Sequence, residues 1–138
     1  AWRCWGLERN RSWMMTEHEE IATALQLYFD GLYEGDQEKF ERIFHENAHL
    51  YFHADGAVSD WPRKDYFERI ANRASPASQD LARRDRIVFI DVSDDGTAYA
   101  KVECQMPPRY FTDYLTLLRD GGRWRIISKT FSTVVREE

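Results

Sequence analysis

The chain has 138 residues, of which 43% are hydrophobic; this suits one domain with one core and is too short for two domains of ordinary size. The formal net charge is −5, and Lys and Arg are scattered among the acidic residues, so no basic stripe is present for nucleic acid. The sequence contains no apolar run of about 18 residues and no signal-peptide core. We therefore expect a cytoplasmic protein with no membrane partner.

The N-terminal stretch differs from the rest of the chain. Residues 1–14 are rich in Trp and Arg without a clean periodicity, whereas Met15-Thr16-Glu17 is typical of a natural start. We expect 1–14 to be an atypical extension, introduced by cloning or upstream translation, and 15–138 to form a single domain. Cys4 and Cys104 lie at no metal or redox spacing, so reduced thiols are expected.

Helical patterns open the domain. Apolar residues recur at spacings of three and four between Thr16, which is expected to cap a helix, and Gly35, which is expected to end it. Asp36 is predicted to cap a second, shorter helix that reaches Asn47. The pattern therefore predicts two packed helices at the start of the fold.

A strand over 49–54 is predicted next, because apolar and polar residues alternate, and the Asp55-Gly56 turn is expected to stop it. A third helix is expected after Pro62, since proline suits the first turn of a helix. Ser75-Pro76 is predicted to break this helix.

The periodicity then changes from near four to two, which predicts four strands in series. Their expected ranges are 86–93, 97–106, 110–119 and 123–135. Residues 94–96 and 120–122 are predicted as three-residue hairpin loops with Gly at the last place, and Pro107-Pro108 as a bend or longer link. Helices followed by a meander indicate an α+β fold, in which helices cover one face of a curved antiparallel sheet and the concave face forms a cavity.

The last hairpin carries an unusual pair of charges. A three-residue loop at 120–122 places Asp113 opposite Lys129, between apolar pairs that include Phe111 with Phe131. Burial of an unpaired ion costs several kcal/mol, so the two are expected either to be buried together or to line a wet cavity. A solvated contact between the strands remains the alternative.

The register of this hairpin determines which of its side chains lie opposite each other. A two-residue loop at Asp120-Gly121 would set Asp113 against Ser128 instead. The side of the hairpin opposite to Asp113 and Lys129 is expected to be half exposed or to face a dimer partner. That outer side is predicted to carry Tyr110, Thr112, Tyr114, Thr116, Leu118, Trp124, Ile126, Ser128, Thr130 and Ser132.

Several blocks of the sequence resemble one known family. They are Tyr28-Phe29-Asp30-Gly31-Leu32-Tyr33-Glu34-Gly35-Asp36, Phe44-His45 with Ala48, Ser75-Pro76-Ala77, Phe111-Thr112-Asp113-Tyr114-Leu115, and Trp124-Arg125-Ile126-Ile127 with Lys129. Over residues 21–133 the chain resembles the nuclear transport factor 2-like superfamily and, within it, the putative lumazine-binding proteins. The resemblance implies a cone-shaped α+β barrel, of the kind also called cystatin-like, with one deep pocket and a homodimer formed through the outer sheet face.

The same superfamily contains ketosteroid isomerase, scytalone dehydratase, limonene epoxide hydrolase and polyketide cyclases, so the fold alone does not select a function. By resemblance, Tyr28 falls at the isomerase's oxyanion-hole tyrosine and Asp113 at its protonated aspartic acid. The isomerase's general base falls at or near Phe52, which cannot abstract a proton. Lys129 would also favour an ionised Asp113. Isomerase chemistry is therefore disfavoured.

Histidines offer a second group of candidates. His45, His49 and His53 are four apart, a spacing typical of metal ligands on a helix. Because the predicted helix changes to a strand between them, the rings are expected to diverge, and no metal site is expected. His53 with Asp55 could act as base and orienter in a dehydratase or hydrolase, with a plain surface histidine as the alternative.

Our leading hypothesis is a small-molecule-binding homodimer with one mostly apolar pocket per subunit and no cofactor, since phosphate-loop, nucleophile-elbow and paired-cysteine motifs are absent from the sequence. The alternatives are a hydratase, dehydratase or isomerase that uses proton transfer, and a structural dimerisation module with a vestigial pocket. The candidate catalytic residues are Asp113, Tyr28, His53 and Asp55. The expected ligand-binding residues are Tyr28, Phe52, Trp61, Phe67, Asp113, Lys129 and Phe131.

Overall fold

The computed structural model describes residues 15–137, so the extension predicted over residues 1–14 lies outside the described residues. The elements, in chain order, are α2 (Glu17–Glu34), α3 (Gln37–Ile43), β1 (Phe44–Ala54), β2 (Ala57–Pro62), α4 (Arg63–Asn72), the 3₁₀ turn η2 (Ala77–Gln79), β3 (Arg86–Val92), β4 (Thr97–Met106), β5 (Arg109–Asp120) and β6 (Arg123–Val135). The α+β class is confirmed. None of the described helices is long and apolar enough to cross a membrane.

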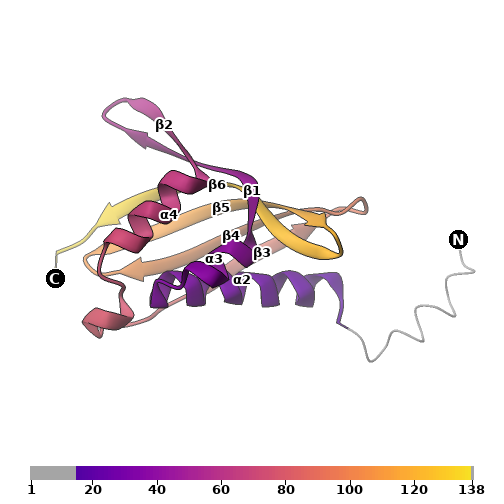
Figure 1. Ribbon diagram of the computed structural model, residues 1–138, viewed down its shortest axis with the longest axis horizontal. Helices are drawn as coiled ribbons and strands as arrows, with labels where there is room; N and C mark the ends of the chain where they lie inside the picture. The colour runs from indigo at the N-terminus through magenta and orange to yellow at the C-terminus, as the bar shows by residue number, and fades with distance from the viewer. Residues whose placement is uncertain (1–14, 138) are drawn as a thin grey trace, which may run out of the picture.

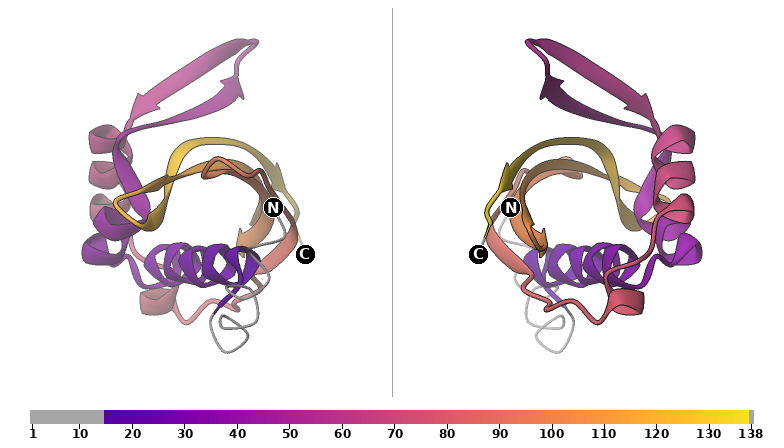
Figure 2. Two further views of the ribbon diagram at one scale, coloured as in Figure 1. Left: turned by 90° about the vertical axis from the view of Figure 1, so that its right-hand side faces the viewer. Right: turned by 90° about the vertical axis from the view of Figure 1, so that its left-hand side faces the viewer.

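One curved sheet organises the domain, with strand order β2-β1-β6-β5-β4-β3. The strands form an unclosed arch whose open side is spanned by α2, and the β1–β2 hairpin projects away from this body (Figure 2). The helices α2, α3 and α4 lie on one side of the sheet (Figure 1). The sheet is antiparallel as expected, except that β1 pairs with β6 in parallel.

The helix boundaries follow from local capping. The Thr16 side chain accepts a hydrogen bond from the Glu19 backbone, and the Glu19 carboxylate accepts one from the Thr16 backbone, which completes a capping box at the start of α2. Gly35 ends the helix with φ +70°, a conformation that glycine adopts without steric cost. Asp36 caps α3 as predicted.

The second helix is shorter than predicted, and one strand was missed. The helix ends at Ile43, because Phe44 already pairs with Ile126 in the sheet. Asp55 and Gly56 both have positive φ, 52° and 80°, as a two-residue hairpin turn requires. The turn therefore does not merely stop β1 but joins it to β2.

The register predicted for the last hairpin is wrong in both of its forms. Gly121 and Gly122 have φ of +59° and +80°, so they form the two-residue turn themselves and Asp120 pairs with Arg123. A β-bulge at Ile127 then adds a second shift, since Leu117 pairs with Ile126 but Thr116 pairs with Ser128.

The bulge also changes which side chains of β6 face the core. Trp124 and Ile126, expected on the outer face, are buried. Beyond the bulge the inward positions are those of Lys129, which is buried, and Phe131, which is partly buried against the core. The change of face at Ile127 therefore lets one strand contribute apolar residues near the turn and a charged residue further along.

The core lies between the concave face of the sheet and the helices. Its largest members include Tyr28, Phe40, Phe44, Leu50, Leu115 and Leu117. Helices α2 and α3 approach closely at Gly31, where an added Cβ would lie 2.7 Å from Cδ1 of Phe40. The absence of a side chain at Gly31 thus allows the Phe40 ring to pack directly against α2.

Candidate functional site

The most unusual feature of the interior is a buried pair of opposite charges. Asp113 on β5 is 0% exposed and Lys129 on β6 is 5% exposed. Asp113 faces Phe131 and Lys129 faces Leu115 across the ladder, so the two charges are diagonal neighbours rather than directly opposed. Lys129 Nζ lies 4.0 Å from Asp113 Oδ2. At this distance the two groups attract each other electrostatically without forming a direct hydrogen bond.

Helix α2 supplies the closest partner of the carboxylate. The Tyr28 hydroxyl donates to Asp113 Oδ2 at 2.5 Å, and burial together with the Asp113 charge raises the pKa of Tyr28 well above its usual value. Tyr28 therefore remains a protonated donor. Asp113 Oδ1 is buried and has no hydrogen-bond partner within residues 15–137, which leaves one acceptor atom of the pair unused.

The Lys129 ammonium is enclosed by aromatic rings. Its Nζ donates to the Tyr66 hydroxyl at 3.1 Å and lies 5.2, 4.8 and 4.9 Å from the ring centroids of Tyr28, Tyr66 and Phe131, within the range of cation–π attraction. Desolvation lowers the pKa of Lys129, but the charge of Asp113 and the Tyr66 phenol outweigh this effect, so the pKa is raised. Lys129 is therefore a cation and not a free amine nucleophile.

A cavity of about 90 Å³ opens beside this cluster. Its polar lining includes Tyr66 and Arg73 from α4 and the turn after it, Asp85 from the segment before β3, and Lys129. Most of the remaining wall is apolar, with Phe29, Leu32, Met106, Phe111 and Phe131 among its members. The cavity therefore combines hydrogen-bond donors with a hydrophobic wall, as small-molecule sites usually do.

Five of the seven expected ligand-binding residues lie in the cavity wall or directly behind it. Lys129 and Phe131 line the cavity. Tyr28 and Asp113 lie behind the lining and contact the site through Lys129. Phe52 packs against Phe131, with centroids 5.1 Å apart.

The other two expected wall residues lie further from the cavity. The Trp61 ring is 4.8 Å from that of Phe52, which in turn packs against Phe131 of the cavity wall. Phe67 packs against Phe40 and borders a different surface groove, which also contains Arg63.

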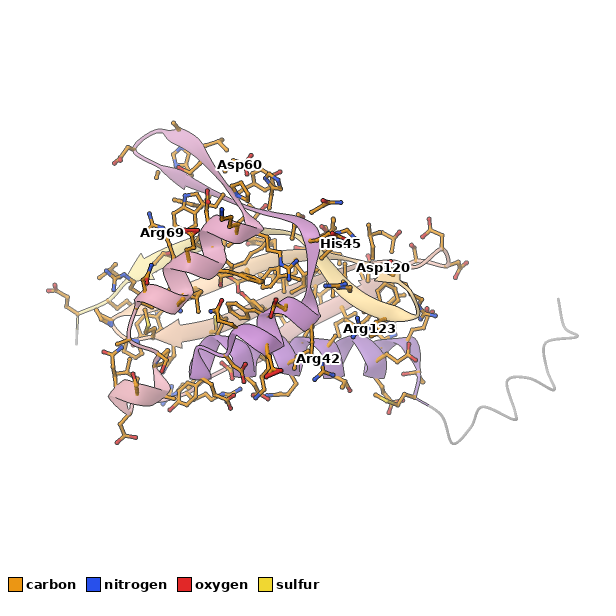
Figure 3. All side chains as sticks on the ribbon, viewed as in Figure 1. Arg42, His45, Asp60, Arg69, Asp120 and Arg123 are labelled. Atoms are coloured by element: carbon orange, nitrogen blue, oxygen red, sulfur yellow. The ribbon has the colours of Figure 1, made fainter. Side chains whose placement is uncertain are left out.

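The catalytic candidates His53 and Asp55 are exposed on the β1–β2 hairpin and do not line the cavity. The other two histidines have separate acidic partners. His45 Nε2 lies 3.6 Å from Asp120 (Figure 3), and His49 Nδ1 lies 2.7 Å from Asp60. Across residues 15–137, no cluster of three or more His, Cys, Asp and Glu side chains is placed to hold a metal ion.

Most of the lining residues were not assigned to the site from the sequence, among them Tyr66, Arg73, Asp85 and Cys104. Tyr66 lies in the predicted third helix, and nothing in the helical pattern indicated that its hydroxyl would meet Lys129. Arg73 and Asp85 lie in segments without periodicity, so no local signal marked them. Burial raises the pKa of the Cys104 thiol well above its usual value, which keeps it protonated 3.9 Å from Asp113 Oδ2.

Comparisons with known proteins agree with this architecture. An NTF2-like protein of unknown function from Shewanella baltica OS155 superposes with a TM-score of 0.77 at 24% identity, covering 87% of this chain and 95% of that one. Another from Silicibacter pomeroyi DSS-3 gives 0.76 at 26% identity, covering 87% of this chain and all of the other. A curated relative, "Aldolase FrzH" from Cladobotryum sp, is 22% identical over 88% of this chain and 94% of its own length.

The family model described as "Putative lumazine-binding" matches residues 16–132, a range that includes every residue lining the cavity. The chain therefore belongs to the putative lumazine-binding family, within the nuclear transport factor 2-like superfamily.

Proposed function

We propose that this protein binds a small organic molecule in the cavity beside Lys129, and that an oxygen atom of the ligand accepts hydrogen bonds from Lys129 and Tyr66. The observation that carries the proposal is the donor pair itself. Lys129 has three N–H groups and uses one on Tyr66. Because the Tyr66 oxygen is the acceptor there, the Tyr66 proton remains available to a ligand.

The surroundings of the donor pair support a ligand with an apolar body. Phe111 and Phe131 on the strands and Phe29 on α2 are part of the wall. Buried donors without acceptors cost free energy, and a ligand oxygen would satisfy them while its carbon atoms cover the rings. The family description is consistent with small-molecule binding.

The size of the cavity limits which ligands can enter without a change in the protein. About 90 Å³ is more than one ordered water needs but is below the roughly 300–1,000 Å³ typical of pockets that enclose drug-sized ligands. A two-ring heterocycle such as lumazine exceeds this volume. Such a ligand would have to extend through the mouth or widen the cavity, whereas a small ketone, aldehyde or acid would fit inside.

The proposal is tested by NMR titration of the ¹⁵N-labelled protein with lumazine, benzoate and pyruvate. We expect at least one probe to shift amides of cavity-lining residues, and Lys129→Met to weaken that binding about tenfold or more, the ratio set by one lost interaction of about 1.4 kcal/mol. Lys101→Met is the matched control, because Lys101 lies over Tyr114 on the outer face.

A second variant separates binding from folding. Tyr66→Phe keeps the ring and the lysine but removes the hydroxyl, and it should weaken the same probe in a protein that retains a dispersed spectrum. If no probe shifts the cavity amides, or if Lys129→Met and Tyr66→Phe bind as the unmodified protein does, the proposal is wrong.

A proton-transfer enzyme is the second candidate function. The donors Lys129 and Tyr66 could polarise a carbonyl group, Asp85 is a carboxylate in the lining, and the curated relative is named an aldolase. The test is exchange of the methyl protons of pyruvate in D₂O. Exchange above the buffer rate that disappears in Asp85→Asn would support this candidate, and exchange at the buffer rate would exclude it for this substrate.

A further inference from the structure

The charged groups of the cavity are not equally compensated. Asp85 accepts from Arg83 Nε at 2.5 Å, and Lys129 is near Asp113. Arg73 has no such partner: within residues 15–137 it forms no hydrogen bond or ion pair, and its Nε is buried without an acceptor. The cavity lining therefore contains one arginine that forms no ion pair and whose buried Nε–H has no acceptor within the described residues.

An unmatched guanidinium at a cavity indicates an anionic ligand group. Burying a donor without an acceptor costs free energy, and the cost is greater for a charged group, so an acid bound there would relieve a cost already present. The planar fork of arginine matches the two oxygens of a carboxylate. The field of Arg73 reaches the cavity, because it lowers the pKa of Tyr66 and of Cys104 against the stronger upward effect of burial.

The location of Arg73 fits an entry position. It follows the last residue of α4 and borders two hollows, the cavity and an open groove that also contains Trp61 and Arg69. A ligand that enters from the groove would meet Arg73 before reaching the donor pair of Lys129 and Tyr66. Its acidic group would then remain at the mouth while the rest of the molecule points inward.

Building on the proposed binding function, we infer that the ligand is a small carboxylic acid whose carboxylate pairs with Arg73 and whose body, carrying a carbonyl or hydroxyl oxygen, extends toward Lys129. A cavity of about 90 Å³ accepts an acid with only a few carbon atoms, or the acidic end of a longer molecule. Neutral ligands of the same shape would leave Arg73 unmatched and bind more weakly.

The experiment compares acids with their amides, which have nearly the same shape but no charge. Pyruvate against pyruvamide and benzoate against benzamide are titrated into the ¹⁵N-labelled full chain, with dissociation constants taken from the shifts of cavity-lining amides. We expect each acid to bind about tenfold more tightly than its amide. In Arg73→Gln this ratio should fall to about two or less, and in Arg73→Lys, which keeps the charge, it should be largely restored.

Arg69→Gln is the matched control. Arg69 lies on α4 one turn before Arg73 (Figure 3), with its guanidinium over Trp61 at 4.0 Å, and it does not line the cavity. This variant should keep the full preference for acids. Cavity binding with equal affinity for acid and amide, or an unchanged preference in Arg73→Gln, would overturn the inference but leave the proposed function intact. If no probe binds in the cavity, both the inference about Arg73 and the proposed function are overturned.

Discussion

The hydrogen bond from Tyr28 to Asp113 allows a quantitative prediction about the stability of the protein. Tyr28→Phe removes only the hydroxyl, and both residues are 0% exposed, so water cannot replace it. Asp113 would then keep only distant neighbours, Lys129 Nζ at 4.0 Å and Cys104 Sγ at 3.9 Å. A hydrogen bond to a charged group contributes about 1.5–3 kcal/mol, so we expect the free energy of unfolding to fall by about 2 kcal/mol or slightly more.

The assay is urea unfolding followed by tryptophan fluorescence and circular dichroism. With a slope of about 2 kcal/mol per molar, typical of a small protein, the midpoint should move down by about 1 M with the slope unchanged. The control is Tyr33→Phe on the same helix. Its hydroxyl donates to the Leu81 carbonyl at 2.8 Å in a partly buried setting, a neutral bond whose loss should cost about 1 kcal/mol.

The comparison between the two variants decides whether the buried Asp113 carboxylate depends on the Tyr28 hydroxyl. If Tyr28→Phe costs no more than Tyr33→Phe, the buried carboxylate does not depend on the tyrosine, and the electrostatic account of the site is refuted. A double variant with Asp113→Asn extends the test, because two groups in direct contact should have non-additive effects. Strict additivity would show that Tyr28 and Asp113 do not interact.

Three further predictions concern packing, pH and charge. Gly31→Ala should destabilise the protein by about 1–3 kcal/mol in urea unfolding, although alanine normally favours a helix, because its Cβ would clash with the Phe40 ring; a gain in stability would contradict this packing. Burial raises the pKa values of Tyr28 and Cys104, so the folded state holds protons that the unfolded chain releases, and urea midpoints should fall as the pH rises above about 9; a midpoint that is flat to pH 10.5 would argue against this. Lys129→Met should cost about 3–5 kcal/mol because it leaves a buried charge alone, and a cost below about 1 kcal/mol by the same assay would show that Lys129 does not compensate Asp113.

Much of the fold could be predicted because its signals are local. The alternating pattern gave the bounds of β4 and β6 as the structure has them, and the caps at Thr16 and Asp36 follow from side chains that bond to nearby backbone. The presence of two charges in the interior could also be predicted, since Asp113 and Lys129 interrupt an apolar pattern.

The register and the full site could not be predicted in the same way. The bulge at Ile127 depends on pairing between strands, and no single-strand pattern reveals it. Strand β2 was missed because its residues are largely exposed, so they lack the alternation that burial imposes. Arg73 belongs to the site only because the turn after α4 returns to the strands, a tertiary arrangement that has no local signature.

The bulge at Ile127 has a consequence for how ligand preference could change over evolution. Counting back from the Gly121-Gly122 turn in an unbroken ladder, Ser128 and Thr130 would point inward and Lys129 would point to solvent. One supernumerary residue reverses that parity, while the glycine turn and the strand partners near it remain as they are. Insertion of one codon between the bulge and Lys129 would therefore turn Ser128 and Thr130 inward and Lys129 outward without any substitution in the cavity wall, whereas loss of the supernumerary residue would leave Lys129 paired with Leu115 and facing inward.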